Sequence, residues 1–169
     1  MEGEFEYLEA CCLTDVGRRR ERNEDACLTL TSKGVFCVAD GMGGAAAGDR
    51  ASRAVVDALR VEFLESPPSP PGKAFGQHVV KVCRAVSKAS QWIRSYARQA
   101  GHEGTGTTCT AMVFGDAHRD RAMVLHAGDS RAYRWRNNAL EQLITDHSVA
   151  MELGVDDEDM LPRYLRGVI

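Results

Sequence analysis

A carboxylate lies between an apolar run and a glycine turn in the stretch Val38-Ala39-Asp40-Gly41-Met42-Gly43-Gly44. The preceding run, residues 34–39, is short, apolar and rich in valine, so it predicts a buried strand that ends at Asp40. The glycines allow close approach to a ligand and positive φ angles. Two interpretations follow: an ion or phosphate site at Asp40, or an ordinary strand-to-helix turn whose acid is favoured by the helix dipole.

The composition is that of one globular domain. The chain has 169 residues, of which 44% are hydrophobic and 27% are charged, and its net charge is −3. Such a balance does not favour binding to nucleic acid or to an anionic membrane surface. No run approaches the roughly 18 to 20 apolar residues of a membrane span. The acidic N-terminus is unlike a signal peptide, and we therefore expect a cytoplasmic protein.

Cysteine usage favours reduced thiols. Six cysteines occur without a CxxC pair or zinc-like spacing, and most lie inside apolar runs. They are predicted to be reduced core residues rather than disulfides or metal ligands.

The order of the predicted elements favours an α+β domain with antiparallel sheets rather than a parallel βαβ fold. Strand patterns precede and follow two helical segments, the first from Gly48-Asp49 to about residue 64 and the second over 73–100. The second helix carries one long apolar stripe, which suits packing within the domain better than a coiled-coil seam. A two-residue hairpin turn is predicted at Asn137-Asn138. The predicted strands cover residues 5–14, 26–31, 35–39, 107–114, 121–127, 131–136 and 139–144.

Acidic residues gather at the ends of three predicted strands. These are Asn23-Glu24-Asp25, Asp40-Gly41 and Gly128-Asp129-Ser130. Mg²⁺ and Mn²⁺ take oxygen ligands, often one or two carboxylates together with water. If two sheets stack, the three ends can converge on one cleft, whereas each acid taken alone is better explained as an ordinary turn residue than as a metal ligand.

Several motifs together resemble the metal-dependent PP2C-type (PPM) serine/threonine protein phosphatases, and their bacterial branch in particular. The motifs are Thr14-Asp15-Val16-Gly17, Arg20, Asn23-Glu24-Asp25-Ala26, VADGMGG at 38–44, GTGTTCTAMVF at 104–114, HAGDSRAYR at 126–134 and TDHS at 145–148. The resemblance implies a four-layer α-β-β-α sandwich of antiparallel sheets flanked by helix pairs. It also implies a centre of two Mg²⁺ or Mn²⁺ ions, with a third in some complete domains, at the end of the sandwich.

The resemblance assigns a role to each candidate residue. It implies that Asp40 bridges two metals and that the Gly41 carbonyl is a further ligand. Glu24 and Asp25 match the acidic pair that binds metal or orients its water, and Asp129 matches an outer acid at a weaker third metal position. Arg20 matches the arginine that holds the substrate phosphate, for which a guanidinium is well suited because it donates two parallel hydrogen bonds.

The family's later ligands, an Asp-Gly segment and a final Asp-Asn pair, have no counterpart before Ile169. Residues 1–169 are accordingly interpreted as a single phosphatase domain that is incomplete at its C-terminus. The acidic cluster at 156–159 suits the start of a capped helix better than a replacement ligand set.

Three functions are compatible with these observations. The first is metal-dependent hydrolysis of phosphoserine and phosphothreonine in proteins, with a Ser/Thr kinase or its targets as partners and a monomeric chain. The second is a catalytically inactive module of the same fold that binds a phosphoprotein or regulates a partner, because two aspartates are missing. The third is a dinucleotide site, since residues 41–46 match GxGxxA, but Asp40 would repel a pyrophosphate there.

Overall fold

The computed structural model describes residues 8–43, 47–67, 74–115, 121–147 and 153–154. Their main sheet has five strands in the order β1-β2-β4-β5, with the short β3 paired to β2. The bounds are Asp25–Leu30 for β1, Val35–Met42 for β2, Gly106–Thr107 for β3, Cys109–Phe114 for β4 and Ala122–Ala127 for β5. Every pairing is antiparallel, as predicted.

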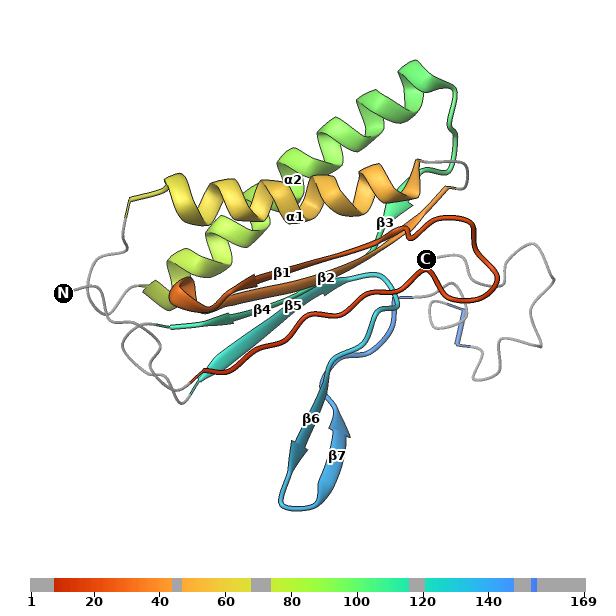
Figure 1. Cartoon of the computed structure of the whole chain (residues 1–169). Helices are drawn as coiled ribbons and strands as arrows, with labels where there is room; N and C mark the ends of the chain where they lie inside the picture. Colours follow the sequence, from red (N-terminus) through yellow and green to blue (C-terminus); the bar gives the residue numbers. More distant parts are fainter. Residues whose placement is uncertain (1–7, 44–46, 68–73, 116–120, 148–152, 155–169) are drawn as a thin grey trace.

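Two helices, α1 (Gly48–Glu65) and α2 (Ala74–Ala100), cover one face of the main sheet (Figure 1). A separate hairpin, β6 (Tyr133–Arg136) and β7 (Ala139–Gln142), projects from the opposite side (Figure 1). The α+β class and both helices are therefore confirmed. Neither helix is apolar over a stretch long enough to cross a membrane within the part of the chain described.

The alternation of buried and exposed side chains along β2 explains how this layer forms. Val35, Cys37 and Ala39 are buried and face the helices, whereas Val38 and Asp40 point to the other face. Leu59 of α1 and Ala85 of α2 are fully buried in the same core. The apolar stripe of α2 thus packs against α1 and the sheet, and not against a partner in a coiled coil.

Local turn chemistry sets the two hairpins. A single turn of 3-10 helix, Thr31–Lys33, joins β1 to β2 and ends at Gly34, which has a φ of 61°. The β6–β7 turn places Asn137 and Asn138 at φ angles of 51° and 58°, which confirms the predicted two-residue turn. Asparagine tolerates this left-handed conformation better than most residues.

Some predicted boundaries were wrong. Residues 8–14, predicted as part of a first strand, have no strand structure, and 5–7 lie outside the described residues. Thr108 interrupts the strand predicted over 107–114, because its backbone N–H donates to Asp40 O at 2.8 Å at the step from β3 to β4. The hairpin strands are shorter than predicted by two residues at the start of β6 and two at the end of β7. The acidic cluster at 156–159 lies outside the described residues.

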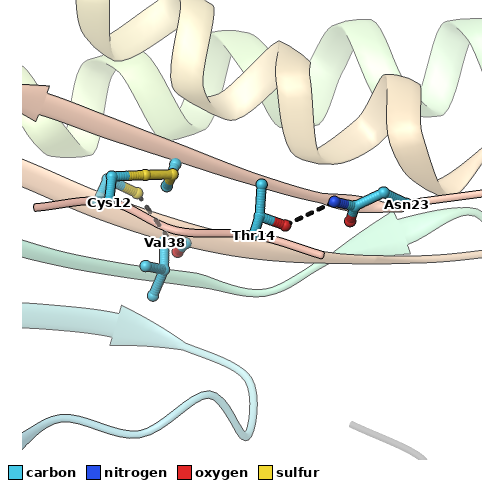
Figure 2. Close-up of a disulfide and its surroundings, with 6 residues drawn as sticks. Cys12, Thr14, Asn23 and Val38 are labelled. Atoms are coloured by element: carbon cyan, nitrogen blue, oxygen red, sulfur yellow. Dashed lines mark hydrogen bonds between the residues drawn. A yellow bond between two sulfur atoms is a disulfide. The ribbon is translucent and has the colours of Figure 1, made fainter. Parts of the chain in front are cut away.

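The cysteine prediction was only partly right. Cys37 and Cys109 are buried, free thiols with their sulfurs 3.8 Å apart, as expected of core residues. Cys11 and Cys83 are exposed, and Cys12 and Cys27 form a disulfide. The prediction failed for Cys12 and Cys27 because the segment around Cys12 lies beside β1 (Figure 2), a proximity that spacing along the chain does not reveal.

Glu62 is a charged residue buried between the two helices. Its side chain is 5% exposed, and its carboxylate accepts hydrogen bonds from Arg84 Nη1 and Lys88 Nζ, both at 3.0 Å. Burial raises the pKa of Glu62, but the hydrogen bonds and positive charges of Lys88 and Arg84 outweigh it, so the pKa lies below its usual 4.5. This ion cluster joins α1 to α2.

We predict that Leu59→Ala lowers the free energy of unfolding by about 2 to 5 kcal/mol, because Leu59 is fully buried and its truncation leaves a cavity. Leu64→Ala is the matched control on the same helix, since Leu64 is 54% exposed; we expect it to change stability by less than about 0.5 kcal/mol. Urea denaturation measures both. Equal losses in the two variants would contradict this account of the core.

We also predict that Glu62 gives the stability a specific dependence on pH. A carboxylate whose pKa is lowered by folding stabilises the fold above its unfolded pKa and loses that contribution as pH falls through the folded pKa. From about pH 5 to about pH 3 the unmodified chain should therefore lose more unfolding free energy than Glu62→Gln. Thermal melts across this range test the difference, and parallel profiles would show that Glu62 has no such role.

Candidate functional site

The site begins with two carboxylates on facing strands. Asp25 opens β1, Asp40 lies near the end of β2, and the register pairs them directly. Both are exposed on the sheet face that points away from the helices. Antiparallel partners share a face, and their side chains lie about 5 Å apart at Cβ. The pairing therefore brings together two acids that are 15 positions apart in the sequence.

The environment of Asp40 is strongly acidic. Partial burial raises the pKa of Asp40, and the charge and hydrogen bond of Asp25 raise it further. The positive charge of Arg20 lowers this pKa, while Asp129 raises it slightly. Arg20, Asp25 and Asp129 thus all lie within electrostatic reach of Asp40. These four predicted site residues interact electrostatically at one end of the sheet, where Gly41 and Glu24 adjoin them.

Glu24 lies on the other face of the strand from Asp25. Its carboxylate is 3.8 Å from Arg20 Nη1, and its side chain is 16% exposed. On its other side it approaches Gly48 so closely that a Cβ added there would lie 2.7 Å from Glu24 Oε1. The described geometry therefore associates Glu24 with Arg20 and the start of α1, and not with the Asp25–Asp40 pair.

Gly41 is required by the close approach of β2 to α1. Its N–H donates to the Glu24 carbonyl at 3.1 Å. A Cβ at Gly41 would lie 2.1 Å from Gly48 O, closer than any real contact. The glycine turn of the opening motif thus lets the sheet end pack directly beneath the helix start, which fixes where Asp40 lies relative to Glu24.

A threonine pair holds the backbone of Asp40. Asp40 N–H donates to Thr108 Oγ1 at 2.9 Å, and Thr107 Oγ1 donates to the Asp40 carbonyl at 3.0 Å. Thr108 Oγ1 also lies 2.6 Å from Ser130 Oγ, next to Asp129. The motifs at 104–114 and 126–134 were quoted for their resemblance, but this supporting role was missed. The available signal was the pair of adjacent hydroxyl residues, Thr107 and Thr108, at the start of a predicted strand that could pair with the strand ending in Asp40.

The segment before β1 is tied to the sheet around Arg20. Figure 2 shows the disulfide that links Cys12 to β1 and the hydrogen bond that Asn23 Nδ2 donates to Thr14 Oγ1 at 2.7 Å. Asn23 Oδ1 also accepts from Asp25 N–H at 3.0 Å. The loop that carries Arg20 is therefore closed at its base, and the Arg20 side chain is 60% exposed and accessible to a ligand.

The donor set fits a hydrated divalent cation better than a fully enclosed one. Asp25 and Asp40 repel each other when both are ionised, which is part of why the pKa of Asp40 is raised. A hard divalent cation bound between them would relieve that repulsion. Within the described ranges no three or more His, Cys, Asp or Glu side chains are arranged to hold a metal ion. Mg²⁺ is commonly bound by one or two carboxylates and keeps several waters, which is compatible with the pair seen here.

The chain matches the family model of protein phosphatase 2C over residues 16–152. It therefore belongs to the protein phosphatase 2C family, as the motifs suggested. The serine/threonine phosphatase stp of Listeria welshimeri is 34% identical over 143 residues, which are 83% of this chain and 55% of that protein. Protein phosphatase PhpP of Streptococcus pneumoniae is 29% identical over 151 residues, which are 86% of this chain and 58% of that protein. The chain thus spans little more than half of these relatives.

Solved structures agree with this assignment. The serine/threonine phosphatase PstP/Ppp of Mycobacterium tuberculosis matches with a TM-score of 0.71 and 30% identity, over 93% of this chain and 64% of that one. The catalytic domain of PstP in complex with two manganese ions matches with a TM-score of 0.69 and 31% identity, over 90% of this chain and 60% of that one. The antiparallel pairing throughout the described sheets leaves no βαβ unit, so the dinucleotide interpretation is not supported.

We predict that Gly41→Ala destabilises the chain by about 3 kcal/mol or more, because the new methyl group meets the backbone of Gly48 rather than a movable side chain. Gly76→Ala is the control: a Cβ there meets nothing within 4 Å, and in a helix the change should stabilise by up to about 1 kcal/mol. Chemical denaturation compares the two. A neutral Gly41→Ala variant would refute the tight contact between β2 and α1.

Proposed function

We propose that this chain carries cation-binding and phosphate-binding residues of a protein phosphatase site and that it hydrolyses phosphoserine and phosphothreonine in proteins with Mg²⁺ or Mn²⁺. The observation that carries the proposal is the Asp25–Asp40 pair, with Arg20 and Asp129 within electrostatic reach of Asp40. Membership of the protein phosphatase 2C family and the manganese-bound relative support it.

In this proposal each residue has a distinct task. Asp40 and Asp25 hold the cation, with the Gly41 carbonyl as a further ligand and Asp129 as an outer acid. When bound, the cation would activate a water for attack on phosphorus and neutralise charge on the phosphate oxygens. Thr107 and Thr108 keep the Asp40 backbone in place through the hydrogen bonds described above.

Arg20 binds the phosphate oxygens of the substrate, and Glu24 positions it. The 3.8 Å ion pair holds the guanidinium at the acidic end of the sheet, while 60% of the Arg20 side chain stays exposed. A guanidinium recognises two phosphate oxygens at once, which orients the phosphoryl group. Electrostatic attraction to Arg20 also offsets the repulsion that an incoming phosphate would feel from the acids.

A second function, phosphoprotein binding without hydrolysis, is favoured by a separate observation. The described residues supply two facing carboxylates and not a metal-holding group of three or more. Arg20 could then bind a phosphorylated residue that is released unchanged. The same assay distinguishes the two functions.

We predict that the full chain releases phosphate from a phosphothreonine peptide in the presence of Mn²⁺, and that Asp40→Asn lowers turnover by about 100-fold or more. Glu65→Gln is the control, because Glu65 is an exposed acid at the C-terminal end of α1, opposite the helix start that packs against Gly41. Phosphate release and peptide binding by fluorescence anisotropy are measured together. Binding that depends on Arg20 without any turnover would support the binding module and refute hydrolysis by this chain.

A further inference from the structure

A groove of about 520 Å³ runs between α1 and α2 on the helix surface. Alanine side chains of both helices form its floor, while the bulky residues of α1, such as Val55 and Leu59, are buried in the core. Short side chains along a helix pair leave an open depression instead of a filled seam. The groove is separate from the Asp25–Asp40 pair, whose residues do not line it.

The groove is positively charged although the chain as a whole is negative. Arg50, Arg53 and Lys88 line it together with one acid, Asp57. Asp57 is offset by Arg60 at 3.4 Å, and Lys88 is offset by Glu62 at 3.0 Å. Arg50 and Arg53 have no ion pair among the described residues, so the groove keeps the charge of two guanidinium groups. This charge is complementary to an anionic ligand.

An aromatic wall stands beside these arginines. Trp92 is 47% exposed and stacks on Tyr96 with ring centroids 5.3 Å apart and an interplanar angle of 2°. The Arg50 guanidinium lies 5.1 Å from the centroid of the Tyr96 ring, which holds it at the same end of the groove. Tryptophan, tyrosine and arginine are enriched among the few residues that contribute most of the binding energy at protein interfaces.

We propose that this groove docks an acidic segment of the protein substrate, with an apolar side chain of that segment against Trp92. This inference rests on the proposed function, because the docked protein is a substrate only if the chain is a phosphatase. Arg50 follows Gly48 by two residues, and Gly48 contacts Glu24, so the groove starts near the candidate site. A protein ligand is favoured over nucleic acid, because two uncompensated cations, an alanine floor and an acid do not form the extended basic track that a phosphate backbone requires.

The test uses Trp92 as its own reporter. Trp135→Phe in the full chain leaves Trp92 as the single tryptophan of the two. The probe is a short unphosphorylated peptide rich in glutamate with one leucine, and its comparison peptide has glutamine in place of glutamate. We expect the fluorescence emission of Trp92 to change, and to reach a plateau, as the glutamate peptide is added, but not as the glutamine peptide is added. Binding of the glutamate peptide should weaken as the salt concentration is raised.

Arg53→Glu provides the decisive variant and Arg94→Glu the matched control. Both arginines are exposed and both changes alter the net charge equally, but Arg94 lines a different cavity beside β5. We expect Arg53→Glu to weaken peptide binding about three- to tenfold and Arg94→Glu to change it less than about twofold. With a phosphopeptide that carries the acidic segment, Arg53→Glu should raise KM and leave kcat unchanged.

Equal weakening by the two variants, equal binding of the glutamine peptide, or tighter binding of a short single-stranded DNA would each overturn the proposal. The probe carries no phosphate, so the docking result is independent of hydrolysis. A chain that binds the acidic peptide through Arg53 but never releases phosphate would refute the proposed enzymatic function and still confirm the docking groove.

Discussion

The register between β1 and β2 is the constraint on which the site depends. It places Asp25 opposite Asp40 on one face and brings the Glu24 backbone to Gly41 N–H at the same level. A slip of one residue would move every side chain of β1 to the opposite face and separate the two carboxylates. The buried positions Leu28 and Cys37, which pair in this register, resist such a slip because it would expose Leu28.

The same strand end carries an energetic conflict that the fold supports from outside the site. Two carboxylates held opposite each other repel, and partial burial of Asp40 adds to the unfavourable term. The surrounding structure keeps them together through Thr107 and Thr108, through the packing of Gly41 against Gly48, and through the closed loop that carries Arg20. Conflicts of this kind are typical of functional sites, where rigid neighbours hold charges in place for a ligand.

The helix pair contributes to function in addition to covering the core. Its inner face buries the apolar stripes, and the Glu62 ion cluster joins the last turns of α1 to the middle of α2. The outer face keeps Trp92, Arg50 and Arg53 exposed. One helix layer therefore provides stability on the side of the sheet and a charged groove on the side of the solvent, and α1 connects this groove to the strand end at Asp40.

The sequence by itself determined the α+β class, both helices, the central strands and the family, because periodicity, turn residues and ordered motifs are local properties of the chain. It also identified Arg20, Asp25, Asp40 and Asp129 as candidates. Tertiary structure alone decided that Glu24 faces α1 while Asp25 faces Asp40, that Cys12 meets Cys27, and that Arg53 and Trp92 border one groove. These outcomes depend on register and on helix packing. Both bring together residues that are far apart in sequence, so no local pattern records them.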